Sequence, residues 1–190
     1  QLKEQELRFL KMQIHPHFLF NTLNTIYGFA LKKSEHTSEM ILKLSNLLDY
    51  ILYQVDEPLV PLKEEIKHLK NYISLEKLRF QEGLAIDLKI HNFNDDVKIP
   101  PMIFLPFIEN AFKHGHQIKD VLKVNINFEC IEDRLIFKME NSTHQKKESK
   151  KGIGLENIKK RLEMIYEDDF KLNITNNSES FKVYLSIPMK

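Results

Sequence analysis

The apolar residues of this chain change their spacing near Gly83. Before that residue they recur every three or four positions, as Leu62, Ile66 and Leu69 do, which is the period of an α-helix with one buried face. After it, over residues 84–90, they alternate with polar residues, which is typical of a β-strand. The pattern predicts an α+β protein, in which a helical part precedes a part that contains a sheet.

The predicted helical part begins with two long amphipathic segments. Apolar residues follow a helical period over residues 2–33, with Pro16 as the only interruption, and again over residues 38–55. Their apolar stripe is too wide for one neighbouring helix to cover, and two helices alone cannot enclose a core. We therefore expect residues 1–60 to form a helical hairpin that pairs with a second copy of itself.

Residues 61–190 predict a second domain, an α/β sandwich with a mostly antiparallel sheet. A helix from Pro61 to about Gly83 leads into it, since proline suits the start of a helix and glycine its end. The elements expected after it are strands over residues 84–90, 121–130, 134–141, 171–175 and 181–187, a helix over residues 102–114, and a helix that opens at Gly152 and Gly154 and ends near Tyr166.

Composition limits what this chain can bind. Lys and Arg number 28 against 27 Asp and Glu, so no global field draws the chain to nucleic acid, and phosphate binding requires a local site. The single cysteine, Cys130, cannot form an internal disulfide, which favours a reducing compartment. No apolar run approaches the ~20 residues that span a bilayer. The chain also begins inside a helical pattern without Met, so we expect a soluble, cytoplasmic fragment whose upstream part is missing.

A polar stripe on the first helix carries a histidine. Gln13, His17, Asn21 and Asn24 fall within one arc of the helical wheel, away from the apolar face. A neutral imidazole keeps a nucleophilic nitrogen at neutral pH, and Pro16 should bend the helix just before it. An ordinary surface histidine beside a break between two helices also fits this segment.

A second polar group closes the predicted helix over residues 102–114. Asn110 and Lys113 lie three apart, on one helical face, and His114 follows them. An amide oxygen can ligate Mg²⁺ while an ammonium neutralises a phosphate oxygen, and a bound triphosphate requires both. Glu109 beside them is our candidate for orienting or deprotonating an attacking group. The same residues also fit an amphipathic helix end whose charges are only solvated.

Gly152, Ile153, Gly154 and Leu155 form a glycine turn in front of the last predicted helix. The backbone amides of such a turn and the helix dipole can face phosphate oxygens without obstruction by side chains. The preceding loop, residues 142–151, is polar and carries four lysines, which either screen phosphate charge or keep the loop soluble. A turn that only connects a loop to a helix also fits these glycines.

Together these segments resemble the LytS-like branch of sensor histidine kinases. The sequence QIHPHFLFNTLN at residues 13–24 looks like the phosphoacceptor motif of that family, PMIFLPFIENAFKHG at 101–115 looks like its N box, and GIGLENIKKRL at 152–162 looks like its glycine-rich G2 box. The three motifs follow the family's order, and the resemblance covers nearly the whole chain.

The resemblance implies a GHKL (Bergerat) ATP-binding fold behind a dimerising helical hairpin. It implies autophosphorylation on His17, an Mg²⁺ ion held by Asn110, and a role as ATP lid for residues 142–151. Glu109 is then the candidate for polarising the His17 imidazole. The residues expected to contact ATP are Asn110, Lys113, His114, Asn141, Gly152, Gly154 and Leu155.

Asn141 is the main departure from the family pattern. The family commonly reads adenine with an Asp where this chain has Asn141, within the sequence MENS. The Asn carbonyl can accept the same hydrogen bond from the adenine amino group, but without the charge that strengthens it. We therefore expect weaker ATP binding or a looser choice of nucleotide. Two smaller departures are His15, where the family often has Asn, and Asp49, where an Arg is common.

The resemblance also implies partners. We expect a homodimer, a response regulator with a DNA-binding output domain as the recipient of the phosphoryl group, and a full-length protein anchored in the membrane. Direct binding to nucleic acid is not expected. Two other functions stay open, namely a pseudokinase scaffold that binds nucleotide without transferring phosphate, and a GHKL ATPase in which Glu109 activates water.

Overall fold

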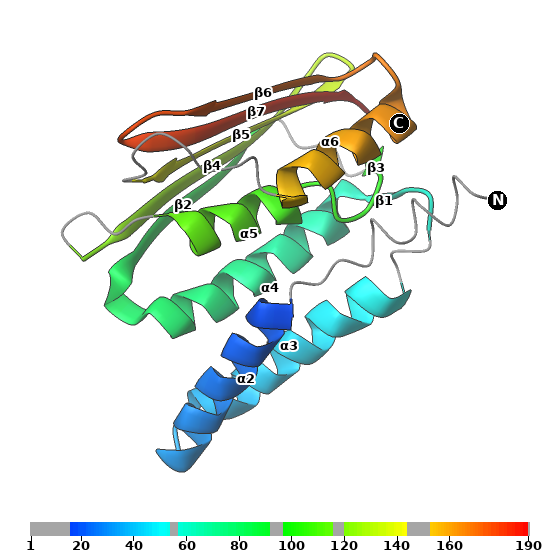
Figure 1. The fold of residues 1–190 in the computed structure, drawn as a ribbon. Coiled ribbons are helices and arrows are strands. Elements are labelled where there is room, and N and C mark those ends of the chain that lie inside the picture. Colours follow the sequence, from blue (N-terminus) through cyan, green and yellow to red (C-terminus); the bar gives the residue numbers. More distant parts are fainter. Residues whose placement is uncertain (1–15, 54–56, 92–96, 116–119, 144–152, 190) are drawn as a thin grey trace. The chain divides into compact units, whose positions relative to one another are not determined.

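The polypeptide divides into two compact units. A computed structural model describes residues 16–53, 57–91, 97–115, 120–143 and 153–189 of the 190-residue chain, and of residues 16, 17, 153 and 154 the backbone only (Figure 1). Residues 1–81 with 100–102 form a helical unit, and residues 82–99 with 103–190 form an α/β unit. The predicted domain boundary, between residues 1–60 and 61–190, stays a prediction.

The helical unit follows the predicted spacing closely. Its described elements are α2 (Pro16–Leu31), α3 (His36–Tyr53), the short strand β1 (Val60–Pro61) and α4 (Leu62–Phe80), which a 3-10 turn, η2 (Gln81–Gly83), extends. The bounds of α3 and α4 lie within three residues of those predicted. The expected helix over residues 2–15 and the bend at Pro16 lie outside the described residues. Among the described helices, none combines the length and the apolar character that a membrane crossing requires.

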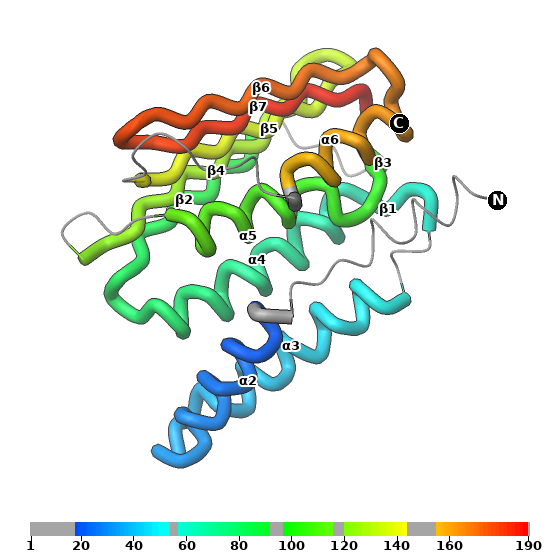
Figure 2. The backbone as a smooth tube through the Cα atoms, viewed as in Figure 1, coloured from blue at the N-terminus to red at the C-terminus, as the bar shows by residue number. Residues whose placement is uncertain are grey.

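A five-stranded sheet forms the α/β unit. Its strands are β2 (Leu84–His91), β4 (Leu122–Ile131), β5 (Arg134–Ser142), β6 (Lys171–Asn176) and β7 (Ser180–Pro188). They are ordered β2-β4-β5-β7-β6, so that β2 and β6 form the two edges (Figure 2). Only β2 pairs in parallel, with β4, and the other pairs are antiparallel. The prediction of a mostly antiparallel sheet is confirmed.

Two helices of the α/β unit cover one face of this sheet. They are α5 (Leu105–His114), which follows the short strand β3 (Lys98–Ile99), and α6 (Ile153–Tyr166), and they contact each other (Figure 1). An aromatic cluster lies beneath α5, where Phe128 of β4 pairs with Phe137 of β5 and both rings contact Phe104 at 4.9 and 5.0 Å between centroids. These rings are at most 1% exposed. The predicted two-layer α/β sandwich is confirmed.

The start of α5 differs from the prediction. The helix begins at Leu105, not at Met102, and it ends at His114 as expected. Met102 has a φ of 59°, in the left-handed region, which a right-handed helix does not include. Pro106 then occupies the first turn of the helix, where its missing N–H leaves no helical hydrogen bond unmade. The apolar run over residues 102–104 is therefore buried without being helical.

Candidate functional site

The last turn of α5 carries three of the predicted site residues. The first half of the helix is buried, while Asn110 is half-buried and Lys113 and His114 are exposed. Asn110 and Lys113 lie one helical turn apart, as the sequence predicted. This spacing places the two side chains on the same side of α5, and both are at least partly exposed to solvent, where a ligand can reach them.

Glu109 occupies a different environment from its neighbour Asn110. Its side chain is 7% exposed, so the carboxylate is withdrawn from solvent on the inner side of α5. The role of Glu109 in polarising an imidazole stays a prediction.

At the end of α5, the surroundings of His114 lower the pKa of its imidazole. Although the residue keeps an exposed surface, desolvation of the imidazole, together with the neighbouring Lys113 ammonium, lowers the pKa of His114 below its ordinary value. The imidazole is therefore neutral at physiological pH. It can donate one hydrogen bond and accept another, which suits contact with a phosphate or a ribose hydroxyl.

Gly115 brings the end of α5 against strand β5. Its N–H donates to the Ala111 carbonyl at 2.8 Å. A Cβ at this position would lie 2.3 Å from that carbonyl oxygen, 2.5 Å from Cδ1 of Leu122 and 3.3 Å from Nδ2 of Asn141. Only glycine fits so close an approach. The sequence indicated Gly115 only as a helix stop, and its steric role beside Asn141 was missed.

Asn141 has a buried side-chain oxygen to which no described residue donates a hydrogen bond. The residue is 2% exposed and lies in β5, opposite Val124 of β4 and Phe181 of β7. Its Nδ2 donates to the Ser142 carbonyl at 3.1 Å, and its Oδ1 receives no hydrogen bond from the described residues. The donation by Nδ2 fixes the direction of Oδ1. A buried carbonyl oxygen without a donor is costly, which marks this position as one prepared for a ligand donor.

Two hydrogen bonds from backbone N–H groups hold the end of β5 next to Asn141. The Lys123 N–H donates to Oγ of Ser142 at 3.1 Å, and the Thr143 N–H donates to the Glu179 carbonyl at 3.0 Å. Ser142 and Thr143 are both buried. The position of Asn141 is therefore set by its place in β5 between the two neighbouring strands β4 and β7, and not by a loop.

The start of α6 carries the glycine-rich motif. Gly154 lies in the first turn of α6 and Leu155 after it is half-buried. Gly152 and residues 144–151 of the predicted lid lie outside the described residues, whereas Ser142, the first residue of that prediction, is the last residue of β5. The exposed N–H groups of a first helical turn and the helix dipole favour an anion at this end. Because α5 and α6 contact each other, both helices contribute to the same side of the sheet.

His17 belongs to the helical unit. Its backbone lies at the start of α2, and its side chain is not among those described. Along α2, a stripe of large apolar side chains is exposed at helical spacing, namely Phe20 at 66%, Leu23 at 47%, Tyr27 at 65% and Leu31 at 67%. Asn24, from the predicted polar stripe, is exposed beside them.

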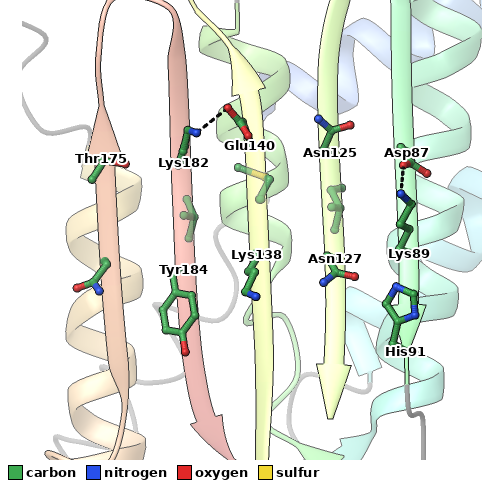
Figure 3. Close-up of a pocket in the computed structure, with 14 residues that line it drawn as sticks. Asp87, Lys89, His91, Asn125, Asn127, Lys138, Glu140, Thr175, Lys182 and Tyr184 are labelled. Atoms are coloured by element: carbon green, nitrogen blue, oxygen red, sulfur yellow. Dashed lines mark ion pairs between the residues drawn. The ribbon is translucent and has the colours of Figure 1, made fainter. Parts of the chain in front are cut away.

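A polar hollow of about 860 Å³ lies on the opposite face of the sheet and is distinct from this site. Side chains from all five strands line it (Figure 3). Two ion pairs occupy it, between Asp87 and Lys89 at 3.1 Å and between Glu140 and Lys182 at 3.0 Å. None of the predicted site residues lines this hollow. It is a broad open surface and not a cavity that encloses a nucleotide.

Comparisons with known proteins bear on the whole chain. A family model for histidine kinases matches residues 5–84. The sensor protein LytS of Oceanobacillus iheyensis is 30% identical and the sensor histidine kinase BtsS of Escherichia coli is 31% identical, each over 100% of this chain. The chain spans 35% and 34% of those two proteins, about a third of their length.

Two solved structures share the fold. The histidine kinase domain of the blue-light activated kinase EL346 from Erythrobacter litoralis matches with a TM-score of 0.54 and 14% identity, over 98% of this chain and 95% of that one. Full-length ShkA, solved in complex with AMPPNP, matches with a TM-score of 0.52 and 14% identity, over 80% of this chain and 37% of that one. The expected resemblance is confirmed by the family model and the relatives together, and the chain belongs to the histidine kinase family, beside the LytS and BtsS sensor proteins.

Proposed function

We propose that this chain is the catalytic part of a sensor histidine kinase that transfers the γ-phosphoryl group of ATP to His17 and then to a response regulator. The observation that supports the proposal is the buried Oδ1 of Asn141, which receives no hydrogen bond from the described residues. By the resemblance, Asn141 takes the place of the residue that reads adenine in the family, and the adenine amino group is a donor of the kind that this oxygen can accept. Full-length ShkA, which shares the fold, binds AMPPNP, an ATP analogue.

The residues present fit a magnesium nucleotide. Mg²⁺ is usually held by one or two protein oxygens together with substrate phosphates and water, so one amide ligand is sufficient. The described residues contain no group of three or more His, Cys, Asp or Glu side chains that could hold a metal by themselves. Asn110 would supply the protein ligand. When bound, Mg²⁺ would neutralise charge on the phosphate oxygens as the terminal group is transferred.

Side chains and backbone groups of this chain bind the phosphates and the adenine and accept the phosphoryl group. Lys113 and the N–H groups at the start of α6 neutralise and orient phosphate oxygens, and Asn141 fixes the adenine. His17 offers a neutral imidazole nitrogen to the terminal phosphorus, in line with the leaving oxygen. The P–O bond to ADP breaks as the P–N bond forms. The phosphohistidine then passes its phosphoryl group to a carboxylate of the response regulator.

The exposed stripe of α2 supports a homodimer. Its four apolar side chains, with Ile41, Leu42, Leu52 and Tyr53 of α3, leave an apolar surface on the hairpin that water does not favour. A second hairpin would cover this surface and complete a four-helix bundle. We further propose that the regulator has a DNA-binding output domain, that the full-length protein is anchored in the membrane and that this part lies in the cytoplasm.

Labelling with ATP marked in its γ-phosphate tests the proposal directly. We expect the purified chain to acquire label that is lost in acid and kept in alkali, as phosphohistidine requires. His17→Ala should abolish the label, whereas His36→Ala, which removes an exposed histidine of α3, should keep it. Bound ATP without label would support a pseudokinase scaffold, and phosphate release that His17→Ala does not change would support an ATPase. Either result would overturn the proposal.

Asn141→Leu tests the adenine contact separately. The substitution removes the unpartnered oxygen, so we expect the Kd for ATP to rise about tenfold, while the free energy of unfolding changes by about 1 kcal/mol or less. Titration with a fluorescent ATP analogue measures the affinity, and urea unfolding measures the stability. Asn125→Leu, on the open face of the sheet, is the matched control and should keep the affinity of the parent. Equal affinities for parent and Asn141→Leu would contradict the adenine contact.

A further inference from the structure

Glu65 of α4 is a buried carboxylate that joins two other segments of the helical unit. Its exposed fraction is 1%. The Tyr50 hydroxyl of α3 and the backbone N–H of Met102 both donate to its Oε2, the latter at 3.0 Å. Withdrawing a carboxylate from water is costly, and hydrogen bonds to its charged form offset that cost. Glu65 is therefore the junction between α3 and Met102.

Tyr50 is fixed on α4 by a second contact. Its ring stacks on the imidazole of His68, with 3.8 Å between ring centroids and an angle of 14° between the planes. His68 is buried and follows Glu65 by one helical turn. The tyrosine is thus clamped between ring stacking and hydrogen bonding from the same helix. A displacement of α3 at Tyr50 would act on Glu65 directly.

Met102 lies three residues before the start of α5. Its φ of 59° is a strained conformation for a residue with a side chain, and it persists only where surrounding contacts hold it. By packing, residues 100–102 belong to the helical unit, while the chain from Ile103 onward belongs to the α/β unit. Phe104, two residues later, accepts hydrogen bonds from Phe107 and Ile108 in the first turn of α5. The backbone that Glu65 holds therefore leads at once into the helix that carries Asn110.

We propose that Glu65 is a positioning residue for phosphoryl transfer, which ties α3 to the start of the Asn110 helix through Tyr50 and Met102. The proposal rests on the kinase function proposed above. Glu65 acts through the Met102 backbone and not on the reacting atoms. A change in the phosphoacceptor hairpin at Tyr50 is thereby transmitted to the segment from which Asn110 and Lys113 are presented. This tie sets the catalytic rate and leaves the affinity for ATP unchanged.

Glu65→Gln in the full chain, with Glu64→Gln as the matched control, tests the tie. Gln keeps the size and one carbonyl oxygen but loses the charge, whereas Glu64, its neighbour on α4, makes an ion pair with Lys67 instead. We expect hydrogen exchange at the Met102 amide to become about tenfold faster in Glu65→Gln. We expect the maximal rate of His17 labelling to fall about tenfold, with the KM for ATP within about twofold of the parent. Glu64→Gln should match the parent in all three.

Each other outcome has a defined meaning. The proposal would be overturned if Glu65→Gln changed neither the exchange at Met102 nor the labelling rate, or only one of the two. It would also be overturned if exchange at Leu69, in the middle of α4, became faster by the same factor, because that would indicate general destabilisation. If Glu65→Gln does not fold, Tyr50→Phe decides by the same readouts, with an expected loss of rate of about threefold. If the parent chain takes up no label, the proposed kinase function is overturned. Hydrogen exchange at Met102 would still test whether Glu65 holds the Met102 backbone.

Discussion

The two units of this chain differ in how far their large apolar side chains are exposed to solvent. In the α/β unit, the phenylalanines under α5 are at most 1% exposed, and Ile131 and Ile174 are the exposed large apolar residues among those described. In the helical unit, Phe20, Tyr27 and Tyr53 are each exposed by 65% or more. The α/β unit thus completes its own core. The described residues of the helical unit leave large apolar side chains exposed.

The largest effect is expected from a cavity in the complete core. Phe137→Ala removes a fully buried ring that contacts Phe104, Phe107 and Phe128. The lost burial and the cavity should lower the free energy of unfolding of the α/β unit by about 4 kcal/mol. Hydrogen exchange of the β5 amides measures it. Ile174→Ala, at a position that is 36% exposed, is the control and should cost less than about 1 kcal/mol. Equal losses would break the contrast between core and surface.

A charge introduced into the exposed apolar stripe of α2 should weaken dimerisation and leave the folding of the chain unchanged. Tyr27→Glu places a carboxylate in the expected dimer interface, where burial without a partner should raise the Kd of dimerisation about a hundredfold. Sedimentation over a range of concentrations measures it. Ile174→Glu, an apolar-to-acid change in the other unit, should leave the Kd as in the parent. A parent chain that is monomeric at every concentration would contradict the role given to this stripe.

The helical unit should also lose stability in acid. Burial lowers the pKa of His68 from 6.5 to about 4. The unfolded chain therefore takes up this proton at a higher pH than the folded chain does, so stability present above pH 6.5 is lost as the pH falls toward 4. We expect a loss of about 3 kcal/mol at pH 4, because each unit of pKa difference between the folded and unfolded chain corresponds to about 1.4 kcal/mol.

His68→Phe tests the origin of that loss. Phenylalanine keeps a ring to stack on Tyr50 and has no proton to gain, so the variant should show a flatter dependence of stability on pH between 6.5 and 4. Urea unfolding at several pH values, followed by exchange of the α4 amides, measures it. An identical dependence in parent and variant would assign the acid sensitivity to other groups.

The smallest effect is expected from a surface ion pair of the α/β unit. Arg134 donates to Oδ1 of Asp169 at 2.7 Å, and the Asp169 side chain is 66% exposed. Arg134 also donates to Oγ of Ser186 at 2.8 Å, which stays in place without the carboxylate. Asp169→Asn should therefore cost less than about 1 kcal/mol, and less again at high salt. A loss comparable to that of Phe137→Ala would mean that this pair is screened from solvent.

Local patterns in the sequence predicted most of the elements. Alternation of apolar residues gave the strands of the hairpin β4–β5 to within one residue, because each strand buries the same face that its alternation defines. Gly115 marked the end of α5 for a local reason as well. The predicted start of α5 was wrong because Met102 has a φ outside the right-handed helical region. Its N–H donates to Glu65, which lies far upstream in the sequence. No local spacing encodes such a contact.

By itself, the sequence determined the helical and strand periods, the fold class and the resemblance to sensor histidine kinases, which the comparisons confirmed. These depend on neighbouring residues, whose spacing sets which face is buried. The tertiary structure alone decided that β2 pairs in parallel with β4, that Gly115 abuts Asn141 and that no described residue donates to Oδ1 of Asn141. Each of these joins residues distant along the chain, and their pairing is fixed by packing and hydrogen-bond geometry that a one-dimensional pattern does not carry.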